Sequence, residues 1–289
     1  MTPPTNPSSG SDRSPELDQS PSSDLATELR DLAIGLARRA GDLISLARKS
    51  GTGSVLTKSS ITDMVTEFDR ASEALIVAGI RVARPHDGII GEEGTAEVGN
   101  SEITWLIDPI DGTTNFFYGL PGYGVSIAAC DQHGPLAAAV FVPATDELFA
   151  ASRGRGATLN GSSIRCSTTK DVSTALLATG FSYQPERRRA QMRRLQHIIG
   201  EIRDIRRIGA AAVDLCHVAA GRVDAYFEEH LGPWDLAAGQ LIATEAGCVA
   251  GDLHGGAVRP EQVLVANSRL FHPLRDLINS VDRLIDLQG

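Results

Sequence analysis

Acidic and hydroxyl residues follow a short apolar stretch in the segment 105–116. Residues 105–107 have the composition of a buried strand, and Asp108 and Asp111 follow them on either side of Pro109. Carboxylate oxygens are hard ligands that suit Mg²⁺ and similar ions. The Pro109 ring fixes its own φ and so limits how the two aspartates can leave the strand. The ends of such strands are common ligand sites in open α/β sheets. The alternative is an ordinary turn, because Asp, Pro, Gly and Thr are all turn residues.

Two further acidic residues occupy comparable positions at the ends of apolar segments. Glu92 lies in a glycine-bounded turn, Gly91–Gly94, directly after the apolar residues 88–90. Asp235 follows Pro233 at the start of a predicted helix, where an acid can also serve only as a cap. Considered singly, Glu92 is explained as a surface glutamate and Asp235 as a helix cap. Gathered together with Asp108 and Asp111, the carboxylates would repel one another unless a cation neutralised them.

Four segments of the chain together resemble the inositol monophosphatase family of Mg²⁺-dependent, Li⁺-sensitive sugar phosphatases. The segments are 63–69, 91–93, 105–116 and 234–247, in the expected order within residues 25–280. The match is most similar to the bacterial inositol-1-monophosphatase branch. The resemblance implies a mixed α and β fold, a five-layer αβαβα sandwich, and a homodimer. One departure is Cys248, which stands where the family's second signature usually has a second glycine, beyond the metal ligand.

The resemblance also implies the roles of individual residues. The first metal ion would be held by Glu92, Asp108, the Ile110 carbonyl and Asp111. The second would be held by Asp108, Asp111 and Asp235, and Asp63 would contact a third. Catalysis is expected from Glu92, Thr113 and Asp111, with Glu92 and Thr113 positioning the attacking water. Substrate would contact Asp111, Gly112, Thr113, Ala211, Glu228 and Asp235. Because no serine or cysteine nucleophile with a paired base is visible, we expect direct in-line attack by water.

Apolar spacing predicts the elements that position these residues. We expect a disordered tail at 1–23, a first half at 24–160 with most metal ligands, and a second half at 161–289 with Asp235 and the substrate contacts. Helices are predicted from Asp24, which could cap the first, and at 64–83, 185–199, 210–221, 235–246 and 271–287. Strands are predicted at 88–90, 103–107, 124–129, 136–142, 147–151, 176–179, 204–207, 225–227 and 263–266. A flexible loop is predicted at 48–62, where Lys58 is a candidate phosphate contact.

Composition excludes several classes of protein. The 289 residues carry a formal net charge of −9 without an offsetting basic stretch, which argues against a nucleic-acid partner. No apolar run reaches the ~18 residues of a membrane-spanning helix, and the N-terminus lacks the order of a signal peptide. The four cysteines have no CxxC spacing, which disfavours a metal or redox site and fits reduced thiols in the cytoplasm.

We therefore predict a Mg²⁺-dependent phosphomonoesterase that hydrolyses myo-inositol 1-phosphate and similar polyol phosphates, with inhibition by Li⁺. Histidinol phosphate and fructose 1,6-bisphosphate are alternative substrates for the same metal site. A nucleotide substrate, 3′-phosphoadenosine 5′-phosphate, would require a longer insertion than this chain contains. A regulatory binding protein on the same fold is the non-enzymatic alternative.

Overall fold

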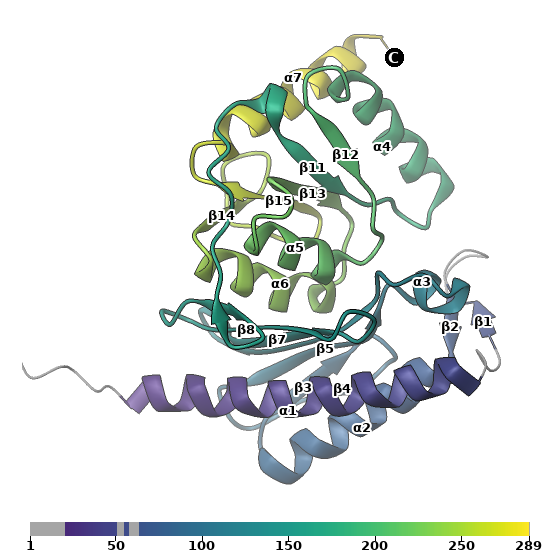
Figure 1. Ribbon diagram of the computed structural model, residues 1–289, viewed down its shortest axis with the longest axis vertical. Helices are drawn as coiled ribbons and strands as arrows, with labels where there is room; N and C mark the ends of the chain where they lie inside the picture. The colour runs from purple at the N-terminus through teal and green to yellow at the C-terminus, as the bar shows by residue number, and fades with distance from the viewer. Residues whose placement is uncertain (1–20, 51–54, 58–63, 289) are drawn as a thin grey trace, which may run out of the picture.

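The computed structural model describes residues 21–50, 55–57 and 64–288, so Lys58 and Asp63 lie outside the described residues. Its elements form five layers, in which pairs of helices alternate with two β-sheets (Figure 1). This arrangement confirms the predicted five-layer αβαβα sandwich. No helix among the described residues is long and apolar enough to cross a membrane.

The helices lie in three layers around the two sheets (Figure 1). The first layer consists of α1 (Pro21–Ser50) and α2 (Glu67–Ala83), the middle layer of α5 (Ala211–Ala219) and α6 (Pro233–Glu245), and the last of α4 (Pro185–Ile198) and α7 (Phe271–Gln288). On α1, Leu29, Leu36 and Ile44 recur on one face and are at most 2% exposed, as expected for a helix that covers one side of a sheet. Helix α6 instead buries most of its residues because it lies between the sheets.

The first sheet has eight strands and the second has five. The first runs in the order β10 (Ser162–Ser163), β9 (Ala157–Leu159), β8 (Glu147–Ser152), β7 (Gly134–Val142), β6 (Gly124–Asp131), β5 (Thr104–Asp111), β3 (Gly88–Gly91) and β4 (Ala96–Glu97). The second runs β12 (Asp204–Arg206), β11 (Leu176–Thr179), β13 (Ala225–Glu229), β15 (Gln262–Asn267) and β14 (Cys248–Gly251). Strands β3 and β5 are parallel, and β11 is parallel to both neighbours. Residues that directly follow the carboxyl ends of β3, β5 and β11 line one pocket.

Several predicted boundaries differ from the structure. Helix α1 begins at Pro21, so the predicted start at Asp24 is wrong and this position lies within the helix. The predicted helix at 64–83 begins only at Glu67, because Met64–Thr66 forms strand β2 and pairs with β1 (Val55–Thr57). Strand β14 and the short helix α3 (Thr113–Tyr118) were not predicted. The continuous apolar spacing of residues 64–68 concealed the change from strand to helix.

Candidate active site

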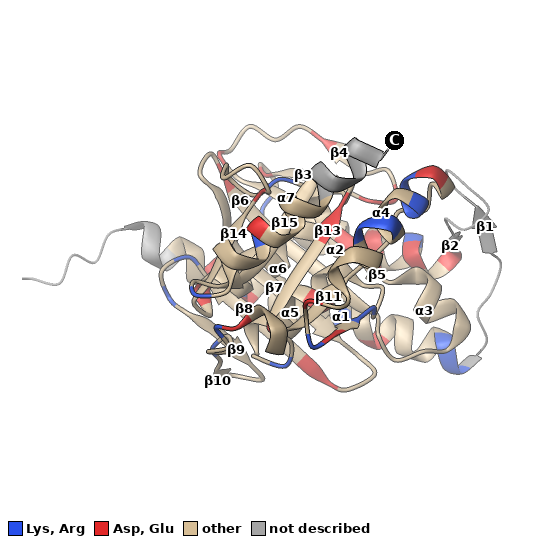
Figure 2. Ribbon diagram, turned by 90° about the horizontal axis from the view of Figure 1, so that it is seen from above, with Lys and Arg blue, Asp and Glu red and all other residues tan. Residues whose placement is uncertain are grey.

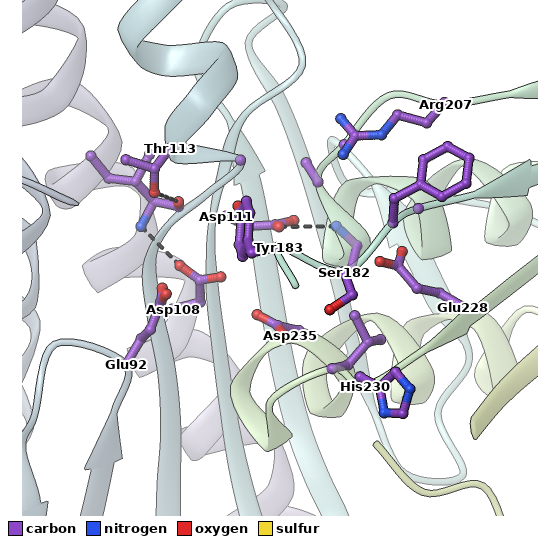
Figure 3. Close-up of a pocket in the computed structure, with 18 of the residues that line it drawn as sticks. Glu92, Asp108, Asp111, Thr113, Ser182, Tyr183, Arg207, Glu228, His230 and Asp235 are labelled. Carbon is purple, nitrogen blue, oxygen red and sulfur yellow. Dashed lines mark hydrogen bonds between the residues drawn. The ribbon is translucent and has the colours of Figure 1, made fainter. Parts of the chain in front are cut away.

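Strand β5 carries Asp108 and Asp111 on either side of an irregularity in its pairing with β6. Asp108 and Asp111 are three positions apart, which would place them on opposite faces of a regular strand. The pairing with β6 shifts register between them, with Asp108 opposite Ser126 and Asp111 opposite Gly124. Such a bulge breaks the alternation of the strand, and both carboxylates face the same pocket (Figure 3).

The pocket has a volume of about 250 Å³ and gathers residues from both halves of the chain. Every predicted site residue among those described lines it: Glu92, Asp108, Ile110, Asp111, Gly112, Thr113, Ala211, Glu228 and Asp235. Figure 3 shows Glu92 and Asp108 at one side, Asp111 and Asp235 near the middle, and Glu228 at the other side. The fold therefore brings together acids that are separated by more than a hundred positions of sequence.

The carboxylates around this pocket interact unfavourably with one another. Asp108 is 2% exposed and Asp111 is 5% exposed. Burial, followed by the negative charges of Glu92, Asp111 and Asp235, raises the pKa of Asp108 well above its ordinary range. Burial and the charge of Asp235 likewise raise the pKa of Asp111, against the opposing effect of backbone N–H groups. A bound cation would relieve this repulsion.

The donor set fits a hard divalent cation, although the side chains do not enclose one. The available donors are carboxylate oxygens and the Ile110 carbonyl, as Mg²⁺ requires. Within the described part of the chain, no three Asp, Glu, His or Cys side chains form a closed metal-binding group. The fit therefore rests on the chemistry of the donors and on the repulsion acting on Asp108.

Asp111 is fixed by the start of helix α5. Its Oδ1 accepts the Ala211 N–H at 2.9 Å, and its Oδ2 accepts the Val213 N–H at 3.1 Å. The N-cap residue of α5 is Ala210, which has no side-chain acceptor, so Asp111 satisfies these amides from the other half of the chain. The Ala211 amide, expected to contact substrate, is thus engaged by Asp111.

Asp235 both caps helix α6 and lines the pocket. It is the third residue of α6, and its Oδ2 accepts the Gly232 N–H at 2.6 Å, as a capping acid does. The same carboxylate lies at the pocket (Figure 3). The capping bond helps to fix the direction of the side chain at the edge of the pocket.

Thr113 contacts the carboxylate of Asp69, which belongs to the segment 63–69 but was not predicted to be a site residue. Its Oγ1 lies 3.0 Å from Asp69 Oδ1 and 3.1 Å from the Ile110 carbonyl oxygen. Asp69 is fully buried in the first turn of α2. An acid in the first turn of a helix has an ordinary explanation in the helix dipole, so only the tertiary structure reveals the contact.

Glu228 lies on β13 with its carboxylate held in place by two neighbours. Its Oε2 accepts the Tyr226 O–H at 2.5 Å, from the residue two positions earlier on the same face of the strand. A Cβ atom on Gly180 would overlap the Glu228 carboxylate, so the glycine leaves the room that the side chain occupies. Burial raises the pKa of Glu228 to about 7, with Tyr226 and Arg207 opposing the shift.

A second buried acid, Asp214, lies behind the pocket on α5. It is 1% exposed, and its carboxyl oxygens have no hydrogen-bond partner among the described residues. Burial and the charges of Glu228 and Asp111 raise its pKa well above the ordinary range, while the Gly209 backbone and the charge of Arg207 oppose the rise more weakly. A buried acid without partners is more stable in its neutral form.

Two cysteines that are distant in sequence are neighbours in the fold. The proximity of the two thiols lowers the pKa of Cys166 to about 7 and raises that of Cys248. Cys166 also donates its backbone N–H to the Ala246 carbonyl at 3.0 Å. All four cysteines are free thiols. Sequence spacing alone could not reveal this contact, because it requires the segment after β10 to lie beside the end of α6.

Several known proteins are similar to this chain over most of its length. The profile of the inositol monophosphatase family matches residues 25–283. The Nus factor SuhB of Vibrio cholerae serotype O1 is 44% identical over 228 residues, which cover 78% of this chain and 85% of that protein. The crystal structure of the extragenic suppressor protein SuhB from Bartonella henselae has a TM-score of 0.83 at 33% identity, covering 87% of this chain and 98% of that one. The IMPase of Thermotoga maritima has a TM-score of 0.82 at 31% identity, covering 89% and 99%.

Proposed function

This chain belongs to the inositol monophosphatase family, and from that premise we propose that it is a Mg²⁺-dependent phosphatase of polyol phosphates with myo-inositol 1-phosphate as substrate. The observation that carries the proposal is the convergence of Glu92, Asp108, Asp111 and Asp235 on one pocket. The mutual repulsion acting on Asp108 supports a cation at this position. Inhibition by Li⁺ belongs to the same proposal.

The metal would be held by oxygen donors of β5, the β3–β4 turn and α6. Glu92, Asp108, the Ile110 carbonyl and Asp111 would hold one ion, and Asp108, Asp111 and Asp235 a second. Bound Mg²⁺ would supply Lewis-acid chemistry, neutralising phosphoryl charge and making water more acidic. The backbone bonds that fix Asp111 and Asp235 orient these carboxylates before any ligand arrives.

Proton transfer in this proposal runs through Thr113 and Asp69. The Thr113 hydroxyl can accept a proton from the attacking water while it donates its own proton to Asp69 Oδ1, 3.0 Å away. Asp69 is fully buried, so bulk water does not compete for this bond. Glu92 lines the same side of the pocket and would help to orient the water. Gly112 and Thr113 remain the proposed phosphate contacts.

Recognition of the polyol would depend on Glu228. A carboxylate can accept hydrogen bonds from more than one hydroxyl. Tyr226 occupies one side of Oε2, and the other lone pairs are available to a substrate in the pocket. Because Tyr226 and Gly180 fix the carboxylate from two sides, the acceptor is positioned before substrate binds.

Phosphate release from purified protein tests this proposal. The substrates to compare, each with and without Mg²⁺, are myo-inositol 1-phosphate, histidinol phosphate, fructose 1,6-bisphosphate and 3′-phosphoadenosine 5′-phosphate. We expect Mg²⁺-dependent hydrolysis, with myo-inositol 1-phosphate among the substrates cleaved. Cleavage of histidinol phosphate alone would be consistent with the proposed metal site but would refute the proposed substrate. If no phosphate is released from any of these compounds, the proposal that the protein is a phosphatase is refuted.

A second candidate function is a binding role that does not require catalysis. The specific observation behind it is that the similar protein from Vibrio cholerae is named a Nus factor. Retention of the acidic pocket favours catalysis, because a purely structural surface has no use for four mutually repelling carboxylates. Asp108→Asn separates the roles: catalysis requires Asp108, whereas a binding role on another surface would survive the substitution. The homodimer and the cytoplasmic location also remain predictions, and sedimentation would test the first.

A further inference from the structure

The segment that joins the two sheets passes beside the turn between α6 and β14. It follows β10 of the first sheet, contains Cys166, and leads to β11 of the second sheet (Figure 1). The Cys166 N–H donates to the Ala246 carbonyl at 3.0 Å. Farther along the segment, the Asn267 side-chain amide donates to the Thr169 carbonyl at 2.7 Å. Asn267 lies opposite Cys248 in the pairing of β14 with β15. These two bonds therefore fix the segment beside Cys248.

This packing brings two thiols together. A Cβ atom placed on Gly247, the residue before Cys248, would lie 3.7 Å from the Cys166 sulfur. The two sulfurs are close enough for each thiol to alter the ionisation of the other. Cys166 is partly exposed, whereas Cys248 is 8% exposed. The remaining cysteines lie in other elements, Cys130 in β6 and Cys216 in α5. Cys166 and Cys248 thus form a pair with one accessible and one buried member.

The two thiols also differ in reactivity. Contact with Cys248, and more weakly the charge of Arg165, lowers the pKa of Cys166 to about 7 against the opposing effect of burial. The same contact and burial raise the pKa of Cys248. Figure 2 shows further basic residues around β8 and β9, in the same part of the first sheet as β10. Because the thiolate is the nucleophile in thiol chemistry, Cys166 is the member that attacks an oxidant from solvent, and Cys248 is placed to react with it afterwards.

We infer that Cys166 and Cys248 form a reversible disulfide when the protein meets a small-molecule disulfide such as glutathione disulfide. The Cys166 thiolate attacks one sulfur of the oxidant, forms a mixed disulfide, and expels the first glutathione thiolate. Cys248 then attacks the Cys166 sulfur, which closes the protein disulfide and expels the second glutathione thiolate. The protons of the two protein thiols pass to the two leaving thiolates. Two electrons move from the protein to glutathione disulfide, which is reduced to two molecules of glutathione.

This disulfide would tie the connection between the sheets to β14, the strand at the end of the five-stranded sheet. It would close a loop of about 80 residues that includes α5, β13 and α6, and such a closed loop restricts the unfolded chain. Cys248 follows the end of α6, whereas Asp235 lies at the start of that helix. We therefore expect oxidation to stabilise the fold and to leave the acidic pocket as it is. The inference does not depend on the proposed phosphatase function.

Equilibration of the native protein with reduced and oxidised glutathione, followed by mass spectrometry after acid quenching, tests this inference. The wild-type protein should lose the mass of two hydrogen atoms, and the peptides that contain Cys166 and Cys248 should be joined. Cys248→Ser should instead retain one glutathione on Cys166, because the second step is blocked. Cys166→Ser should leave Cys248 unmodified. Cys130→Ser is the matched control and should form the disulfide as the wild-type protein does.

Thermal unfolding of the same samples provides a second measurement. The oxidised wild-type protein and oxidised Cys130→Ser should unfold about 5 °C or more above their reduced forms, and Cys248→Ser should show no such increase. Three outcomes would overturn the inference: a wild-type protein that keeps its thiols free, a wild-type protein that retains glutathione on Cys166, or a disulfide that joins other cysteines. An oxidised protein with the unfolding temperature of the reduced one would refute the stabilising effect.

Discussion

Replacing Gly180 with alanine should weaken substrate binding without altering any group proposed to take part in the chemistry. The three atoms nearest to a Cβ at this position all belong to the Glu228 carboxyl group. The carboxylate is the far end of a flexible side chain, so it would swing away while the backbone stays in place. The displaced carboxylate would give up the Tyr226 hydrogen bond and its position for the polyol hydroxyls.

The size of the effect follows from that lost contact. A hydrogen bond to a charged group contributes about 1.5–3 kcal/mol, and each 1.4 kcal/mol changes an equilibrium constant tenfold. We therefore expect KM for the preferred polyol phosphate to rise about 10- to 100-fold in Gly180→Ala. The turnover number should change little, because the contact is made equally in the bound substrate and in the transition state.

Steady-state kinetics on Gly180→Ala, Glu228→Ala and the double variant form the assay. Once Glu228 is alanine, the added Cβ at residue 180 meets no carboxylate, so the double variant should resemble Glu228→Ala alone. Gly200→Ala is a suitable control, because a Cβ atom there meets no other atom within 4 Å. Additive losses in the double variant, or a wild-type KM in Gly180→Ala, would refute this reasoning.

Three further predictions concern Asp69, Asp214 and Cys166. Asp69→Asn should lower kcat about 100-fold or more while thermal unfolding stays close to wild type, because it removes the proton acceptor of Thr113; an unchanged kcat would exclude the proposed proton path. For Asp214, burial keeps the folded group protonated above the pH at which the unfolded group ionises, so wild-type stability should fall as pH rises from about 4 toward the raised folded pKa. Asp214→Asn should remove up to about 1.4 kcal/mol of this loss per pH unit in chemical denaturation, and a stability difference independent of pH would contradict the assignment. Cys166, with a pKa of about 7, should be alkylated by iodoacetamide at pH 8 well before Cys130, whose pKa burial raises to about 12. Mass spectrometry of digested protein measures the order of alkylation, and modification of Cys130 before Cys166 would contradict the prediction.

Family and fold could be predicted because their signals are local in sequence. The strand and turn at 105–116 and the helix start at Asp235 are each contained within a dozen residues, and their order along the chain indicated the family. The structure confirms the five layers and places the acidic residues of these segments in one pocket. The position of Asp108 and Asp111 on one side of β5 depends on a bulge that a motif containing Pro109 could suggest but not establish.

Contacts between the halves could not be predicted in the same way. Gly180 has an ordinary strand-end context, and its role depends on the Glu228 side chain reaching it from a neighbouring strand. Asp69 resembles any acid in the first turn of a helix until Thr113 is placed beside it. Arg207 could not be distinguished from Arg206 by sequence, because only the structure shows the Arg207 guanidinium lying against Gly209. These features are set by tertiary packing, which no periodicity records.

The most direct test of the account is Mg²⁺-dependent release of phosphate from myo-inositol 1-phosphate by the wild-type protein and by Asp108→Asn. The account predicts that wild-type activity appears on adding Mg²⁺ and that Asp108→Asn abolishes it, because Asp108 lies at the centre of the repelling carboxylates. Asp204→Asn, which alters an exposed acid paired with Arg206, should behave as wild type. Hydrolysis that needs no divalent cation, or that survives in Asp108→Asn, would contradict the account.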